Sequence, residues 1–96
     1  MPDIDAVRTA IIKECESLCA LLLAKNDEYG NSALEPINIF AEGSAAAQLA
    51  VRIDDKLSRI STTRQMVDGD LQIHEDTVLD LLGYLVLLRV DQRLEE

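Results

Sequence analysis

Aromatic residues are scarce in this sequence, which has no tryptophan, one phenylalanine and two tyrosines. The core must therefore be built from leucine, isoleucine, valine and alanine, a set that suits helices better than sheets. Because 48% of the residues are hydrophobic, disorder is not expected. A chain of 96 residues is the length of one domain, and its core is thin unless the chain associates.

Positive charge is also scarce. Nine lysines and arginines stand against 18 acidic residues, which gives a formal net charge of -9. This balance argues against a duplex nucleic acid partner, because affinity for a phosphate backbone needs many Lys and Arg contacts. A single nucleotide is a different case, since two or three cations at one spot, or a divalent metal bridging to carboxylates, are enough.

The sequence has no segment typical of membrane insertion or secretion. There is no apolar run of about 18 residues and no basic-then-apolar leader, so we expect a cytoplasmic protein without a membrane partner. Cys15 and Cys19 lack a second Cys or His pair, which favours packed thiols over a metal site. His74, the sole histidine, is expected to be a surface or capping residue.

Apolar residues recur at helical spacing in three segments, which predicts helices over residues 3–26, 45–61 and 75–94. Each segment opens with residues typical of helix starts: Pro2 and Asp3, then Ser44, then Glu75 and Asp76. We therefore predict an all-α fold in which residues 1–96 form a single helical domain.

The third helical segment is apolar on more than one face between residues 78 and 90. Such a helix must be covered on more than one side, and two partner helices from the same chain can hardly do this. We expect a three-helix protomer that forms an oligomeric helical bundle, most simply a twofold dimer.

Two segments break the helical pattern. Residues 26–43 form a long connection, and a long loop in a small domain is often shaped for a task. Its apolar residues are expected to pin it to the core: Leu34, Ile37, Ile39 and Phe40. Phe40 is the expected anchor. Residues 62–72 are expected to form a connection that turns at Asp68, Gly69 and Asp70.

The second helix carries a polar ridge opposite its core stripe. The ridge includes Arg52, Asp55, Lys56 and Arg59. Arginine suits a bidentate grip on phosphate, and lysine supplies a mobile point charge. Arg52 and Lys56, four residues apart, repel each other unless an anion lies between them. The alternative is a set of surface ion pairs with little energetic value.

A second group lies where the first helix runs into a glycine turn. Ammonium, carboxylate, phenol and amide groups follow one another there, on Lys25, Asp27, Tyr29 and Asn31. The alternative to a binding role is an ordinary helix C-terminus in which Gly30 is the turn glycine.

A third group is spaced by fours along one edge of the third helix: Asp76, Asp80 and Tyr84. Two carboxylates at this spacing repel each other, so a divalent cation between them is one interpretation. The other is an ion pair between Asp80 and Lys56 or Arg59 across the interface of two helices.

These three blocks read KNDEYGNSALEP, VRIDDKLSRI and EDTVLDLLGYLVLL. In this order they resemble the small phage and prophage proteins of the nucleotide modification associated domain family, over about residues 20–90. The matching residues are Lys25, Asn26, Tyr29, Gly30 and Asn31, then Arg52, Asp55, Lys56 and Arg59, then Asp76, Asp80 and Tyr84. The resemblance implies a role in nucleotide metabolism or modification.

The acid-led, leucine-rich third helix is also similar, more faintly, to the all-helical MazG-type nucleoside triphosphate pyrophosphohydrolases. Those enzymes hold magnesium with pairs of acids three residues apart, whereas Glu14 and Glu16 are two apart and point to different faces. An enzyme hypothesis would place Mg²⁺ on Asp27, Asp76 and Asp80 and predicts release of pyrophosphate.

The favoured hypothesis is binding of a phosphorylated nucleotide. Phosphate would lie on Arg52, Lys56 and Arg59, with Tyr29 or Tyr84 against the base or ribose and Asn31 fixing its orientation. In a phage setting such binding would sequester a nucleotide signal of host defence. The alternatives are the Mg²⁺-dependent pyrophosphohydrolase and a non-catalytic interaction module that docks a partner on the third helix.

Overall fold

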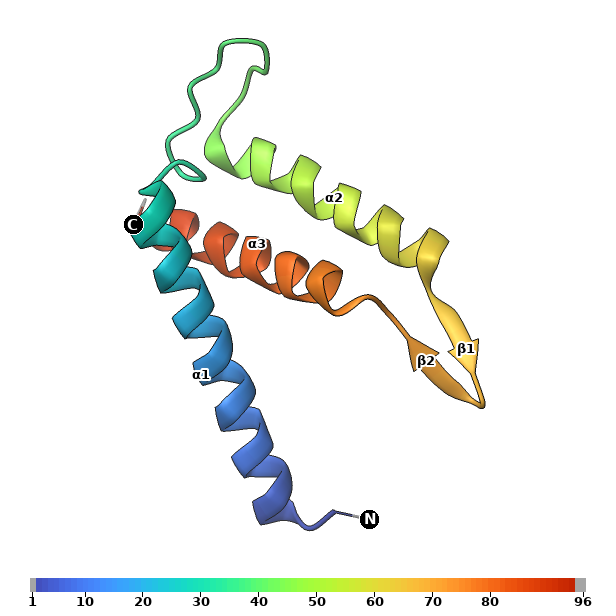
Figure 1. Ribbon diagram of the computed structural model, residues 1–96. Coiled ribbons are helices and arrows are strands. Elements are labelled where there is room, and N and C mark those ends of the chain that lie inside the picture. Colours follow the sequence, from blue (N-terminus) through green and yellow to red (C-terminus); the bar gives the residue numbers. More distant parts are fainter. Residues whose placement is uncertain (1, 95–96) are drawn as a thin grey trace. The chain divides into compact units, whose positions relative to one another are not determined.

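A computed structural model describes residues 2–94 (Figure 1). It divides the chain into two compact units, Met1–Gly30 and Asn31–Glu96, and each is considered by itself. Three helices confirm a mostly helical fold, and a small two-stranded sheet adds to them. Among the described residues, no helix is both long enough and apolar enough to cross a membrane. The single domain stays a prediction.

The first unit is one helix, α1 (Ile4–Tyr29). It begins as expected, because the Asp3 carboxylate accepts a hydrogen bond of 2.7 Å from the Ala6 N–H. It ends beyond the predicted Asn26, at Tyr29, where Gly30 adopts a φ of 64° and donates its N–H to the Asn26 carbonyl at 2.7 Å. The polar residues after Asn26 do not stop the helix, and the glycine does.

No residue of α1 is buried. Large apolar side chains remain more than half exposed at Ile4, Ile11, Ile12 and Leu23. A single helix cannot cover its own apolar stripe, so these side chains stay exposed in this unit.

The second unit is organised by two antiparallel helices that lie side by side, α2 (Ala45–Thr63) and α3 (Glu75–Leu94) (Figure 1). Ser44 caps α2 as predicted, with its hydroxyl accepting the Ala47 N–H at 3.1 Å. The helix passes its predicted end at Ser61, and the Thr63 hydroxyl donates to the Arg59 carbonyl at 2.6 Å. Local side-chain bonds thus extend the last turn.

The predicted start of α3 at Glu75 is confirmed, and the helix continues to Leu94, the last residue described. At the start of α3, the His74 carbonyl accepts hydrogen bonds from the N–H groups of Thr77 and Val78, at 3.1 and 3.2 Å. His74 itself is exposed, so it is a surface residue at the capping position, as expected.

The core of the second unit is small. Leu49 of α2 is 1% exposed and Ala45, one turn earlier, is 8% exposed. Gly83 is the buried residue of α3. Aliphatic and small residues therefore form this interface, in keeping with the scarcity of aromatic residues.

Between α2 and α3 the chain forms a β-hairpin rather than a plain connection. Strand β1 (Gln65–Val67) pairs antiparallel with β2 (Asp70–Gln72). The predicted turn is confirmed: Asp68 and Gly69 have φ values of 51° and 84°, as a two-residue hairpin loop of the I′ type requires. Three-residue strands are too short to show alternation in the sequence, which explains why the pattern predicts only a connection.

The loop of residues 31–44, which leads into α2, differs from what the sequence predicted. Phe40 is fully exposed, and Ile37 and Ile39 are 81% and 71% exposed, so the prediction that they pin the loop to the core is wrong. The core of this unit, with Ala45 and Leu49 as its buried apolar residues, is too small to cover these loop side chains. Leu34 is half-buried, and the loop contacts α2 through polar groups instead.

Leu49 tests how much of the fold depends on this small core. We expect Leu49→Ala to lower the free energy of unfolding by about 2 to 5 kcal/mol, because it leaves a cavity at the centre of the α2–α3 contact. Val51→Ala on the same helix, where the side chain is 69% exposed, is the control and should cost less than about 0.5 kcal/mol. Urea unfolding followed by circular dichroism measures both; equal losses would contradict this account.

Candidate functional site

The cations of the polar ridge on α2 have three different partners. The residues of this ridge separate into three arrangements: one ion pair with α3, one ion pair within α2, and one cation stacked on an aromatic ring. The role of each cation follows from its partner.

Lys56 bridges the two helices. Its Nζ lies 3.2 Å from Oδ2 of Asp80 on α3, and the two side chains are 12% and 32% exposed. For Asp80, this geometry confirms the alternative of an ion pair across the helix interface. A half-buried pair like this orients both side chains and reduces the charge that Lys56 offers to any other anion.

Arg59 is paired within its own helix. Its Nε lies 3.4 Å from Oδ2 of Asp55, four residues earlier, and both side chains are more than half exposed. This is the surface ion pair expected as the alternative to phosphate binding, and pairs of this kind contribute a few tenths of a kcal/mol.

Arg52 has a different partner. Its guanidinium carbon lies 5.8 Å from the centre of the Tyr84 ring on α3. A cation above an aromatic ring, within about 6 Å of its centre, is attracted by the ring's quadrupole. Within residues 2–94 no carboxylate forms an ion pair with Arg52.

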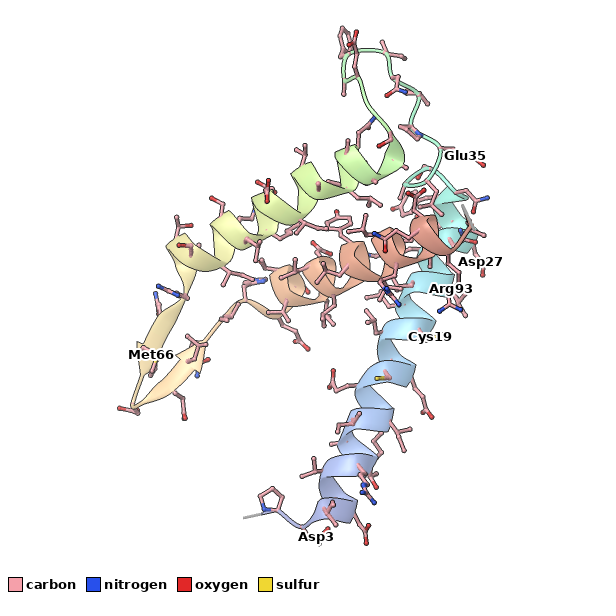
Figure 2. All side chains as sticks on the ribbon, turned by 180° about the vertical axis from the view of Figure 1, so that it is seen from behind. Asp3, Cys19, Asp27, Glu35, Met66 and Arg93 are labelled. Carbon is pink, nitrogen blue, oxygen red and sulfur yellow. The ribbon has the colours of Figure 1, made fainter. Side chains whose placement is uncertain are left out.

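Arg52 also lines a hollow of about 500 Å³ between the loop and the first turns of α2. Its polar lining consists of Ser32, Glu35, Asn38, Gln48 and Arg52, and its apolar lining of Pro36, Ile37, Ile39, Phe40 and Ala41. Figure 2 shows Glu35 on the loop that leads into α2. The hollow is open to solvent, since Phe40, Ile37 and Ile39 of its lining are 100%, 81% and 71% exposed.

An amide contact holds the loop beside α2. The side-chain amides of Asn38 and Gln48 lie 2.6 Å apart, and the Gln48 nitrogen is 3.3 Å from the Gly43 carbonyl. The Asn38 amide fits best with its nitrogen toward the carbonyls of Ala41 and Gly43. Asn38 has a positive φ of 53°, which asparagine tolerates better than most residues. The loop is therefore joined to α2 by a polar contact, whereas the sequence predicted an apolar one.

The group at the end of α1 is a helix C-terminus, as its alternative interpretation proposed. The Asn26 amide donates to the Gly30 carbonyl at 3.1 Å, which closes the last turn. Lys25, Asp27 and Tyr29 lie in the first unit, and Tyr29 is 63% exposed. Asn31 begins the second unit, where its carbonyl accepts the N–H of Leu34 at 2.9 Å. Their predicted meeting with the ridge stays a prediction.

The predicted metal residues are distributed over both units. Asp27 is on α1, Asp76 is exposed in the first turn of α3, and Asp80 is bonded to Lys56. Over residues 2–94 no three His, Cys, Asp or Glu side chains gather in a way that could hold a metal ion. The magnesium site also stays a prediction.

Of the ten residues that line the hollow, Arg52 alone was among the sequence candidates; Glu35, Asn38 and Phe40 were not predicted as ligand contacts. The sequence could have indicated Gln48, because it lies four residues before Arg52 on the same ridge. It could not have indicated the loop residues, since the conformation of a loop does not follow from periodicity.

Comparison of the chain with protein-family models, with curated proteins and with solved structures finds no match. The resemblance to the nucleotide modification associated domain family therefore stays a prediction.

The different environments of the two ion pairs predict different coupling energies. In a double-mutant cycle, Lys56→Ala and Asp80→Ala should show a coupling of about 1 to 3 kcal/mol, because removal of either side chain leaves the other as a half-buried charge that has lost this ion pair. The matched cycle of Asp55→Ala and Arg59→Ala should give less than about 0.5 kcal/mol. Unfolding free energies of the eight proteins measure both; equal coupling would mean that burial of the first pair has no effect.

Proposed function

We propose that this protein binds a phosphorylated nucleotide in the hollow between the loop and α2. The observation that carries the proposal is Arg52, a cation stacked on Tyr84 and lining the hollow. Arginine is well suited to phosphate because its N–H donors match two phosphate oxygens at once. Stacking on Tyr84 limits the freedom of the side chain before the ligand arrives, which lowers the entropy cost of binding.

The apolar wall of the hollow supports the same function. Phe40 is fully exposed, and it shares this wall with Ile37 and Ile39. An exposed aromatic ring costs free energy in water, and a nucleobase stacked on it contributes about 1 to 3 kcal/mol. The hollow therefore offers a phosphate ligand at Arg52 and a stacking surface at Phe40.

This assignment narrows the predicted set of ligand residues. Lys56 and Arg59 are engaged by Asp80 and Asp55, so Arg52 is the phosphate residue and Gln48 is the neighbouring polar group. Tyr84 acts through the position of Arg52. In line with the family resemblance, we propose that the nucleotide is held unchanged, so that binding removes a signal from solution.

Arg52→Ala should weaken nucleotide binding by about tenfold to a hundredfold, the loss expected for a charge-assisted hydrogen bond. Arg59→Ala removes the same charge from the same ridge, outside the lining of the hollow, and should change affinity less than about twofold. Titration calorimetry with a panel of mono-, di- and triphosphates measures binding, and chromatography of the recovered ligand tests whether it is unchanged. Absence of binding by the wild-type protein would overturn the proposal.

A specific observation also favours self-association. In α3, Leu82, Leu85 and Val86 are 40%, 41% and 37% exposed. In α2, Val51 and Leu57 are 69% and 49% exposed, while Leu49 is the one large side chain buried below 2% in the described residues. Small domains with so little buried surface are marginally stable alone, so we propose that the chain is a homo-oligomer, most simply a twofold dimer.

Association predicts that stability depends on protein concentration. The midpoint of thermal unfolding should rise with concentration, because the folded assembly is favoured by mass action. Light scattering at micromolar concentration should give at least twice the mass of one chain. A folded species of 10.6 kDa whose unfolding midpoint does not change over a hundredfold dilution would contradict this proposal.

A further inference from the structure

The charges around the hollow determine which nucleotides it can hold. Of the three cations on the ridge, Lys56 lies 3.2 Å from an Asp80 oxygen and Arg59 lies 3.4 Å from an Asp55 oxygen. Each of these two cations therefore has an acidic partner, which reduces the charge that it offers to a ligand. The lining itself contains one cation, Arg52, and one acid, Glu35.

The rest of the chain adds to this restriction. Its formal net charge is -9, so the potential at the hollow is not raised by distant cations. A ligand with one phosphate brings about 1.5 to 2 negative charges, of which one guanidinium compensates about one. Each additional phosphate brings more negative charge toward Glu35 and finds no second cation in the lining.

Resting on the proposed function, we propose that the ligand is a nucleotide with a single phosphate. Arg52 holds that phosphate, Phe40 and the neighbouring isoleucines contact the base, and Glu35 disfavours longer phosphate chains by repulsion. A carboxylate can only accept hydrogen bonds, so Glu35 is compatible with ribose hydroxyls or base N–H groups and incompatible with a phosphate oxygen. The acid in the hollow is thus a specificity-determining residue.

The test compares adenosine and guanosine mono-, di- and triphosphates by calorimetry, with and without Mg²⁺. We expect the monophosphate of the preferred base to bind about tenfold more tightly than its triphosphate without Mg²⁺. Mg²⁺ should narrow this difference, because it compensates phosphate charge. Triphosphate binding tighter than monophosphate binding in either condition overturns the inference and leaves the proposed function standing.

A pair of variants isolates the role of the acid. Glu35→Gln should raise triphosphate affinity about threefold to tenfold and change monophosphate affinity much less. Glu42→Gln makes the same change of charge in the same loop outside the lining, and should leave both affinities within about twofold. Equal effects of the two variants overturn the inference, since they would show a general effect of net charge. No binding of any nucleotide overturns the proposed function itself.

Discussion

Packing of α2 against α3 is the contact on which the second unit depends. Leu49 is fully buried there, Gly83 is the buried position of the facing helix, and Lys56 pairs with Asp80 across the same interface. The contact between Arg52 and Tyr84 also requires that these two helices keep their register. An apolar contact supplies the driving force, and the ion pair restricts which side chains can lie opposite each other.

The ion pairs of α2 determine which of its cations is available at the candidate site. Asp80 and Asp55 pair with Lys56 and Arg59, so the acids of the chain engage two of the cations of α2, and the third, Arg52, lines the hollow. Of the three cations of this helix, Arg52 is the one without an ion pair to an acid within residues 2–94. Specificity for small anions can arise in this way in an acidic protein, through neutralisation of neighbouring groups rather than through accumulation of positive charge.

Features that depend on local chemistry could be predicted from the sequence. Asp3 and Ser44 cap their helices as expected, and the start of α3 was predicted correctly, because caps and periodicity act within a few residues. The partner of Asp80 remained one of several alternatives, since the sequence does not determine which α2 side chain lies opposite it. Phe40 was assigned to the core because hydrophobicity alone does not show whether a core lies within reach of the loop.

The hairpin between α2 and α3 has a consequence for how the protein behaves in concentrated solution. A sheet of two strands has two open edges, and Met66 and Leu71, which are opposite each other, are 66% and 57% exposed (Figure 2 labels Met66). Such an element invites strand addition by another molecule. Here each strand has only three residues and acids border the turn, so an incoming chain would find few backbone groups to pair with and would meet negative charge. Shortness and charge protect an apolar hairpin from growing into an aggregate.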